Sequence, residues 1–251
     1  MASFNPMVFD RKSVFMQRIA DHARAGYLHW TGGEIPVQKA AMLARKFADL
    51  YLVGLTKDVR FKRKKLGLGN AVLLLWKVQG EAQTHIQFVL MVSAGGHPAH
   101  QLERLQDVRL SRVQVTGYEL LQLPRKGQVK PAWTWRMTAE AYKHWEFRIE
   151  QVTKSRNPRL AAVAFFSLYK SPGFAGIRSQ VGYLVKFWRG VWKRVKRSSE
   201  AFFPPRVLYY VSRLPDRGMR LSALVAQRAR VNLAAGTPFE RPEEGLGNAR
   251  S

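Results

Sequence analysis

Cysteine is absent from the 251 residues of this chain, and acidic residues are scarce. Without cysteine the chain can form no disulfide, use no thiolate nucleophile and offer no thiolate ligand to zinc. The 17 Asp and Glu residues are scattered, which argues against a nuclease that gathers carboxylates around two metal ions. The sequence also lacks a P-loop, a G-x-S-x-G nucleophile elbow and the His-apolar-His strand of metal-dependent nickases.

Long apolar runs are missing as well. No stretch of about 18 apolar residues is present to span a membrane. The N-terminus lacks the basic, apolar and small-residue pattern of a secretory signal. Together with the lack of cysteine, these features predict a cytoplasmic protein with no membrane partner. Hydrophobic residues make up 46% of the chain, which is enough for a folded core.

Positive charge is what the chain has in excess. The 42 Lys and Arg residues against 17 Asp and Glu give a formal net charge of +25. Such an excess costs self-repulsion unless a polyanion neutralises it. Nucleic acid is the leading partner, because its phosphates release counterions to a basic surface. An anionic membrane surface is the rival partner.

Hydrophobic periodicity predicts an α+β fold with a ferredoxin-like unit over residues 1–124. After a first helix, the order is strand, helix, strand, strand, helix, strand, as in the βαββαβ unit of RNA-recognition domains. One face of such a sheet is free for a partner. The predicted elements are a helix over 11–25, a strand from Gly26 ending in a glycine turn, a helix from Pro36, a basic loop over 56–69, a hairpin of Asn70–Gln79 and His85–Ser93, a short helix from Pro98 to Leu105 and a strand over Val113–Leu123.

Residues 125–235 are predicted to be a mostly helical, basic region with one late strand, and 236–251 a flexible tail. The predicted elements are a helix from the cap Thr138 to Lys154, helices over Leu160–Tyr169 and within Gly173–Arg197, a strand over Val207–Leu214 and a helix over Leu221–Leu233.

The segment Gly173–Arg197 is the strongest single candidate for contact with nucleic acid. Its apolar residues recur at helical spacing, and its basic residues fall mostly on other faces. Its glycine-rich start would let backbone N–H groups approach a phosphate. The alternative is an amphipathic surface helix with solvated charges. We expect its basic face to grip the groove of an RNA hairpin.

Other basic and aromatic residues extend this prediction. The cluster within residues 57–65 is expected to contact phosphates, although a localisation signal or a solubilising run has the same composition. Aromatic residues such as Tyr27, Trp30 and Trp133 either stack on bases or belong to the core. The predicted RNA-binding residues are Arg60, Lys62, Arg63, Lys64, Lys65, Arg125, Lys126, Arg178, Lys186, Arg189, Lys193, Arg194, Lys196 and Arg197.

His29 is the histidine best placed for chemistry, with Arg24 before it and Lys39 after it. A histidine can act as general acid or base near neutral pH, and the two cations could stabilise charge on a phosphate. A hydrogen-bonded strand histidine is the alternative. The pair His97 and His100 has no acidic residue at ligand spacing, so no metal site and no cofactor are predicted.

The predicted order over Gly26–Leu123, the sequence GFAGIRSQVG at 173–182 and the basic helix after it resemble the repeat-cleaving endoribonucleases of CRISPR systems. These belong to the repeat-associated RNA-binding superfamily, and the processing subunit of type IV CRISPR complexes is the most similar member. The resemblance implies metal-independent cleavage of CRISPR repeat RNA, with a 2′,3′-cyclic phosphate and a free 5′-hydroxyl as the new ends. It also implies that the protein stays on the product hairpin and that other CRISPR effector subunits are its partners.

On this basis Arg24, His29 and Lys39 are predicted to lie near the cleaved phosphate. Two other functions remain open. One is a non-catalytic RNA- or DNA-binding protein of a mobile element, and the other is a DNA replication or transfer initiator. The initiator would attach covalently to DNA through Tyr118, Tyr142 or Tyr183.

Overall fold

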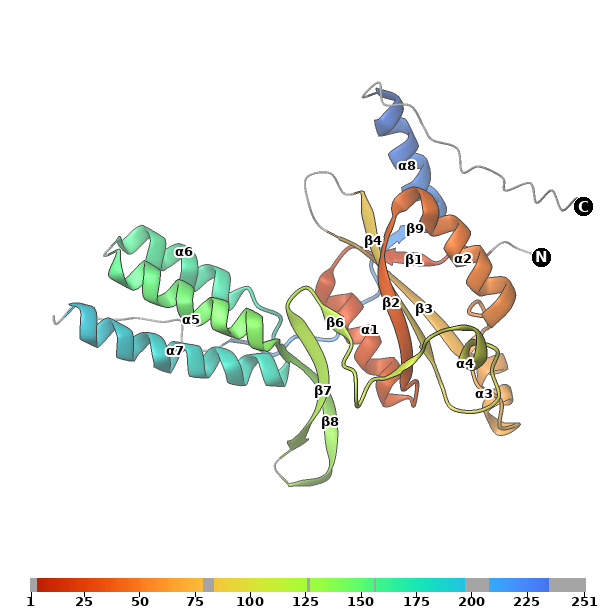
Figure 1. The fold of residues 1–251 in the computed structure, drawn as a ribbon, viewed down its shortest axis with the longest axis horizontal. Helices are drawn as coiled ribbons and strands as arrows, with labels where there is room; N and C mark the ends of the chain where they lie inside the picture. Colours follow the sequence, from red (N-terminus) through yellow and green to blue (C-terminus); the bar gives the residue numbers. More distant parts are fainter. Residues whose placement is uncertain (1–3, 79–83, 126, 156, 197–207, 235–251) are drawn as a thin grey trace, which may run out of the picture.

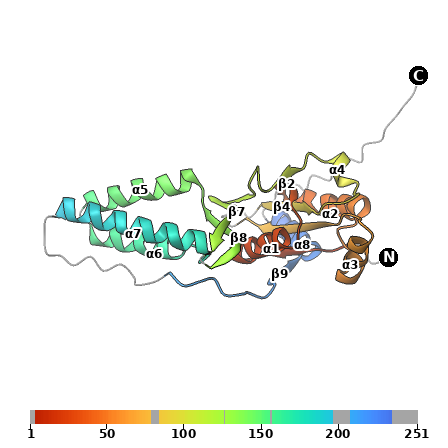
Figure 2. The same cartoon turned by 90° about the horizontal axis from the view of Figure 1, so that it is seen from below.

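The computed structural model describes residues 4–78, 84–125, 127–155, 157–196 and 208–234. Over these ranges the chain is a mixed α+β protein with two β-sheets. Three long helices extend away from the sheets as an arm (Figures 1 and 2). The predicted tail over 236–251, Lys126 and Arg197 lie outside the described residues.

The main sheet has six strands in the order β5-β2-β4-β3-β1-β9. Strands β3 and β4 pair antiparallel, which confirms the predicted hairpin, whereas β1 lies parallel to β3. Helix α1 covers one face, and helices α2 and α8 cover the other (Figure 1). The elements are β1 Met7–Phe9, α1 Lys12–Arg24, β2 His29–Pro36, α2 Val37–Tyr51, α3 Lys57–Lys65, β3 Ala71–Lys77, β4 His85–Val92, α4 Ala99–Leu102, β5 Gln106–Asp107, β9 Gly218–Arg220 and α8 Leu221–Ala234.

Both faces of the main sheet are buried, and alternating residues of β3 show how. Leu73 and Leu75 point into the core beneath α2 and α8, while Leu74 and Trp76 join the core beneath α1. Because side chains alternate along a strand, a run of apolar residues such as Ala71–Lys77 fits a strand covered on both sides. This two-sided burial differs from the open sheet face expected for an RNA-recognition unit.

A second sheet has three strands in the order β6-β7-β8, with β6 at Gln114–Val115, β7 at Tyr118–Arg125 and β8 at Gln128–Met137. The stretch Val113–Leu123, predicted as the fourth strand of the ferredoxin-like unit, lies here. Thr116 and Gly117 both have positive φ (42° and 77°), which closes a two-residue hairpin between β6 and β7. The ferredoxin-like unit is therefore not confirmed, because its fourth strand pairs with β8 outside the main sheet.

The arm consists of α5 Ala139–Lys154, α6 Pro158–Tyr169 and α7 Ala175–Lys196. The predicted helices are confirmed here, including the cap at Thr138, whose hydroxyl accepts a hydrogen bond from the Ala141 N–H. The rings of Phe165 and Trp188 stack with centroids 3.7 Å apart and thereby join α6 to α7. The apolar core of the arm is continuous with the core beneath α1.

Three local predictions were wrong. The glycine turn predicted after the strand from Gly26 is not formed, because Gly32 and Gly33 lie inside β2 and pair with Val89 and Phe88 of β4. The basic loop predicted over 56–69 is largely helix α3, which Thr56 caps by accepting a hydrogen bond from the Val59 N–H. Asp58 in its first turn and Lys62–Lys65 in its last turn complement the helix dipole. In the stretch Val207–Leu214, the described residues 208–214 form no strand, and the late strand of the chain is β9 instead.

Residues 208–217, here called the return segment, run from the arm back to the main sheet. Side chains of α1 satisfy their backbone groups in place of a strand partner. Gln17 donates to the Ser212 carbonyl (2.7 Å) and accepts from the Leu214 N–H (3.2 Å). Arg18 donates to the Leu214 carbonyl at 2.6 Å. A periodicity argument cannot detect this arrangement, because the partners are side chains almost 200 residues away.

The buried Trp135 of β8 connects the second sheet, α1 and the arm. Its indole N–H donates to the Met16 carbonyl of α1 at 2.9 Å, and its side chain is fully buried. Gly176 in the first turn of α7 packs against the carbonyl of the same residue, where an added Cβ would come within 2.6 Å of the oxygen. Only glycine fits this contact without displacing the backbone of β8.

Two glycines of α7 should therefore respond to alanine in opposite directions. Gly176→Ala should destabilise the protein by roughly 1–3 kcal/mol, because the methyl group overlaps the Trp135 carbonyl. Gly182→Ala should stabilise it by about 1 kcal/mol, because that position is exposed and helical, and among the described residues no atom beyond its own stretch of helix lies within 4 Å of an added Cβ. Chemical denaturation of both variants measures the two changes. Equal effects of the same sign would contradict the packing described for Gly176.

Candidate nucleic-acid interface

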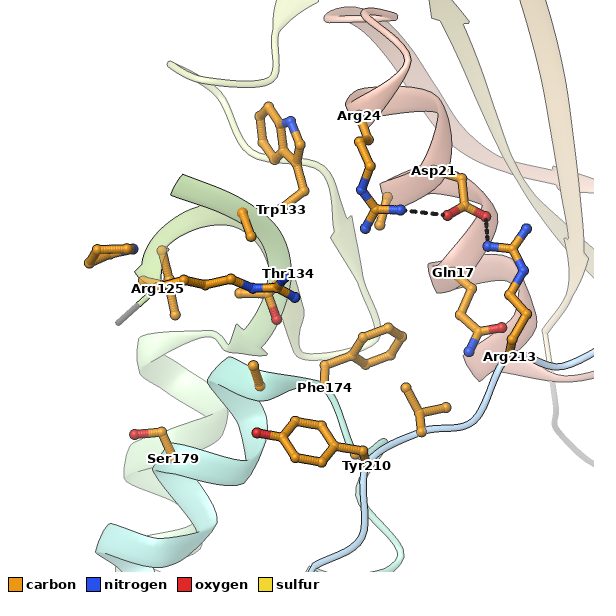
Figure 3. A pocket seen from close by; sticks show the side chains of 17 residues that line it. Gln17, Asp21, Arg24, Arg125, Trp133, Thr134, Phe174, Ser179, Tyr210 and Arg213 are labelled. Atoms are coloured by element: carbon orange, nitrogen blue, oxygen red, sulfur yellow. Dashed lines mark hydrogen bonds and ion pairs between the residues drawn. The ribbon is translucent and has the colours of Figure 1, made fainter. Parts of the chain in front are cut away.

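A cavity of about 490 Å³ lies where the second sheet, α1, α7 and the return segment meet. Its walls carry three arginines, and we call it the arginine cavity. Arg24 comes from α1, Arg125 from the end of β7 and Arg213 from the return segment (Figure 3). Trp133 lies toward the same end of the cavity as Arg24, and Phe174 and Tyr210 lie toward the other.

One carboxylate, Asp21, stands against these cations in the cavity wall. It pairs with Arg24 at 3.1 Å and with Arg213 at 2.6 Å. The arginine side chains are 62% and 67% exposed, so these pairs are weak and can yield to another anion. Arg125 has no acidic partner within the described ranges. The cavity therefore has a local excess of positive charge.

Arg178 was predicted to bind RNA, and the structure gives it an internal role. Its guanidinium donates to the Leu208 carbonyl at 2.6 Å and lies 3.5 Å from the centroid of the Tyr210 ring. This cation–π contact fixes Tyr210 beside the cavity. Arg178 thus holds the return segment against α7 and is half-buried in doing so.

The glycine-rich start of the Gly173–Arg197 segment is also explained by packing. A Cβ on Gly173 would overlap the Tyr209 carbonyl, and the Gly173 carbonyl accepts a hydrogen bond from the Val211 N–H at 3.0 Å. Gly173 and Gly176 therefore let two chain segments approach α7 closely. The start of α7 nevertheless borders the arginine cavity through Ala175 and Ser179, and Phe174, just before the helix, extends that border. Its positive helix end favours an anion there.

The basic residues predicted on α7 are exposed along the arm. Lys186, Arg189 and Lys193 follow one another at spacings of three and four, which places them on one face, and we call them the basic stripe. Arg194 is exposed beside it, while the side chain of Lys196 lies outside the described part of the chain. Helix α7 contains no Asp or Glu. The stripe extends over about 10 Å of helix.

The basic residues of α3 form a separate group. Lys62, Lys64 and Lys65 are exposed, whereas Arg60 and Arg63 are partly buried. Arg63 donates to the Gly69 carbonyl at 3.0 Å and so helps to end the helix. Both views place α3 at the end of the molecule away from the arm (Figures 1 and 2). The structure therefore does not bring the α3 and α7 groups together.

The three residues predicted near a cleaved phosphate are also separated. Arg24 lines the arginine cavity, but His29 and Lys39 are not among its lining residues. His29 begins β2 and Lys39 lies just beyond its far end. Eight strand residues put those ends about 23 Å apart. The ring of His29 lies 4.8 Å from that of His100, and among the described residues its buried Nδ1 has no hydrogen-bond partner.

Sequence reasoning missed two cavity residues, Asp21 and Arg213. They are 192 positions apart and meet because the return segment crosses α1. Within the described ranges, no three His, Asp or Glu side chains are grouped closely enough to hold a metal ion. No helix in the same ranges is long and apolar enough to cross a membrane.

Comparisons of the chain with protein-family models, with curated proteins and with solved structures gave no significant match. A function must therefore be assigned from the chemistry of the arginine cavity and of the basic stripe.

His22, next to Asp21 on α1, should make the stability of the protein fall as the pH is lowered. Burial, followed by the nearby Arg60 guanidinium, lowers the pKa of His22 from 6.5 to about 4. Between pH 6.5 and 4, His22 is therefore protonated in the unfolded chain and neutral in the folded chain. The free energy of unfolding should fall by on the order of 3 kcal/mol as pH drops from 6.5 to 4.

The variant His22→Gln should lose this part of the pH dependence, measured by urea denaturation at several pH values. Exposed His144 offers a matched control, because His144→Gln should keep the decline of the unmodified protein. A decline that is unchanged in His22→Gln would show that other groups cause it.

Proposed function

We propose that this protein binds nucleic acid, and specifically an RNA hairpin. The observation that carries the proposal is the arginine cavity, where Arg24, Arg125 and Arg213 outnumber the single carboxylate of Asp21. Guanidinium groups match phosphate oxygens with paired hydrogen bonds. Trp133 and Tyr210 in the same walls offer faces on which bases can stack. The net charge of +25 adds long-range attraction for a polyanion.

The arm supplies the second half of the proposed interface. Helix α7 starts at the cavity and carries the basic stripe outward, so one ligand can contact both. A base-paired stem would lie along the stripe, while nucleotides next to the stem would enter the cavity. The resemblance to CRISPR repeat-processing endoribonucleases favours RNA over DNA. It also makes a guide-RNA complex with other effector subunits the proposed setting.

Metal-independent RNA cleavage is the second candidate function, and the favourable observation is a carboxylate held among arginines. In this reaction the 2′-oxygen attacks the adjacent phosphorus, and the bond to the 5′-oxygen breaks. A proton passes from the 2′-hydroxyl to the leaving 5′-oxygen. Arg24 and Arg125 would stabilise the charge on the phosphate in flight, and Asp21 would accept the 2′-hydroxyl proton.

The alternative of a DNA initiator would require a reactive tyrosine. Burial raises the pKa of Tyr118, and burial together with Glu146 raises the pKa of Tyr142. Both shifts weaken these hydroxyls as nucleophiles near neutral pH. Tyr183 is exposed on α7, and covalent attachment of DNA to it would favour the initiator.

Reversing the basic stripe should weaken hairpin binding without unfolding the protein. The triple variant Lys186→Glu, Arg189→Glu, Lys193→Glu changes three exposed side chains. We expect an affinity loss of at least 10-fold and a reduction of the salt slope, log Kd against log salt, by about 2–3. Fluorescence anisotropy with a labelled RNA hairpin at several salt concentrations measures both quantities.

A matched control carries the same charge change on α2, at the opposite end of the molecule from the arm (Figure 1). Lys39→Glu, Arg45→Glu, Lys46→Glu also changes three exposed residues. It should lose affinity only through the general change in net charge. If both triple variants lose the same affinity, the stripe is not a binding surface. A DNA hairpin of the same sequence tests the preference for RNA.

Cleavage should occur in EDTA and leave a 2′,3′-cyclic phosphate on the upstream product. Arg24→Ala should slow it by at least about 100-fold, the scale seen when one charge-stabilising donor is removed. Lys39→Ala should leave the rate unchanged, since Lys39 lies away from the cavity. End-specific labelling followed by phosphatase treatment identifies the product ends. Tight binding of repeat hairpins without any cleavage would leave the protein as a non-catalytic binder.

A further inference from the structure

Two further hollows continue from the arginine cavity across the molecule. The middle hollow, about 160 Å³, shares Trp133 with the arginine cavity. The third, about 310 Å³, shares Arg112 with the middle hollow. Since each neighbouring pair has a lining residue in common, the three hollows lie in a row, and we call this row the groove. It runs from α7 past the second sheet to strands β2 and β4 of the main sheet.

The chemistry changes along this groove. Its first part has Arg125, which lacks an acidic partner in the part of the chain that the structure describes, and its middle part has Arg109 and Arg112. These two arginines are 58% and 39% exposed, and Asp107 and Glu119 balance them. The described lining of the third hollow contains no acidic residue, and amides dominate there. We call it the amide hollow, after Gln87, Gln106 and Gln114.

Two features of the amide hollow suit a planar polar group. An amide side chain both donates and accepts hydrogen bonds, as the edge of a nucleic-acid base does. Gly32 and Gly33, inside strand β2, bring no side chain, so the floor there is exposed backbone. Glycine inside a strand weakens it and often marks close approach of a ligand or of another backbone. At Gly32 that neighbour is the Phe88 carbonyl of β4, 2.6 Å from where a Cβ would lie, whereas the nearest atoms to a Cβ on Gly33 belong to the Phe88 ring. The half-buried Trp30 forms part of the wall.

We infer that this groove holds the single-stranded nucleotides that continue from the bound stem. Phosphates would pass the arginines, Trp133 would stack on one base at the junction of two hollows, and a following base would reach the amide hollow. The occupant is argued from the charged, aromatic and amide side chains that follow one another along this row of hollows. The inference rests on the proposed function, because the stem on α7 fixes where the single strand begins.

The experiment compares a blunt RNA hairpin with the same hairpin carrying a 3′ or a 5′ extension of one to six nucleotides. One of the two extensions should tighten binding to the unmodified protein. Trp133→Ala should reduce affinity for that extended hairpin by about 5- to 150-fold, the range that loss of one stacked base gives. The loss should be smaller for the blunt hairpin, which has no extension to stack on Trp133, and Trp133→Phe should restore most of the loss with the extended hairpin.

A control is Phe61→Ala, which removes an exposed aromatic ring on α3, at the end of the molecule away from the arm. It should bind both hairpins as the unmodified protein does. A second readout avoids any effect on folding. For this readout, 4-thiouridine is placed in the extension of the hairpin, which is then bound to the unmodified protein. Cross-linking should label the peptide that contains Gln106–Gln114.

The outcomes separate the two proposals. If the blunt hairpin binds and neither extension adds affinity, the groove proposal is wrong and the proposed function stands. If an unstructured single strand binds through Trp133 while the blunt stem does not bind, the groove proposal stands and the proposal that the protein binds a hairpin is wrong. Cross-links confined to peptides outside the three hollows would also overturn the groove.

Discussion

Trp135 is the contact on which the arrangement of this molecule depends. Its indole N–H donates a hydrogen bond to the Met16 carbonyl, and its own carbonyl packs against Gly176. Its ring centroid lies 6.5 Å from that of Phe174. Through these contacts one buried side chain fixes β8 relative to α1 and α7. Because the same three elements form walls of the arginine cavity, apolar packing sets the position of Arg24 relative to those walls. Arg213 is placed by the hydrogen bonds that Gln17, Arg18 and Arg178 donate to the return segment.

Elements with a strong local signal were predictable from the sequence. The helix after Thr138 and the hairpin of β3 and β4 follow from a cap and from apolar runs. The errors came where a tertiary contact or a short turn decided the structure. Thr116–Gly117 splits one apparent strand into a hairpin, and the return segment bonds to Gln17 instead of to a strand. Neither outcome changes the hydrophobic period, so periodicity could not reveal it.

The candidate site was only partly predictable for a similar reason. Arg24 and Arg125 were singled out by charge and position, and both line the cavity. Arg213 could not be grouped with them, because only the path of the return segment brings it to Asp21. Lys39 was grouped with His29 by nearness in sequence, yet a strand of eight residues carries such neighbours to opposite ends of a sheet. Sequence distance is thus a poor guide to which charges cooperate.

The topology gives the arm a mechanical property. Residues 113–217 leave the main sheet after β5 and rejoin it at β9, so the second sheet and the arm are an insertion within one sheet. A module attached at both ends, and bonded again to α1 through Gln17 and Arg18, has little freedom to swing. Rigid placement of a binding surface lowers the ordering cost that association imposes. The arm therefore presents a surface of fixed position. A ligand that does not match this surface would have to change its own conformation in order to bind, and that change would cost binding free energy.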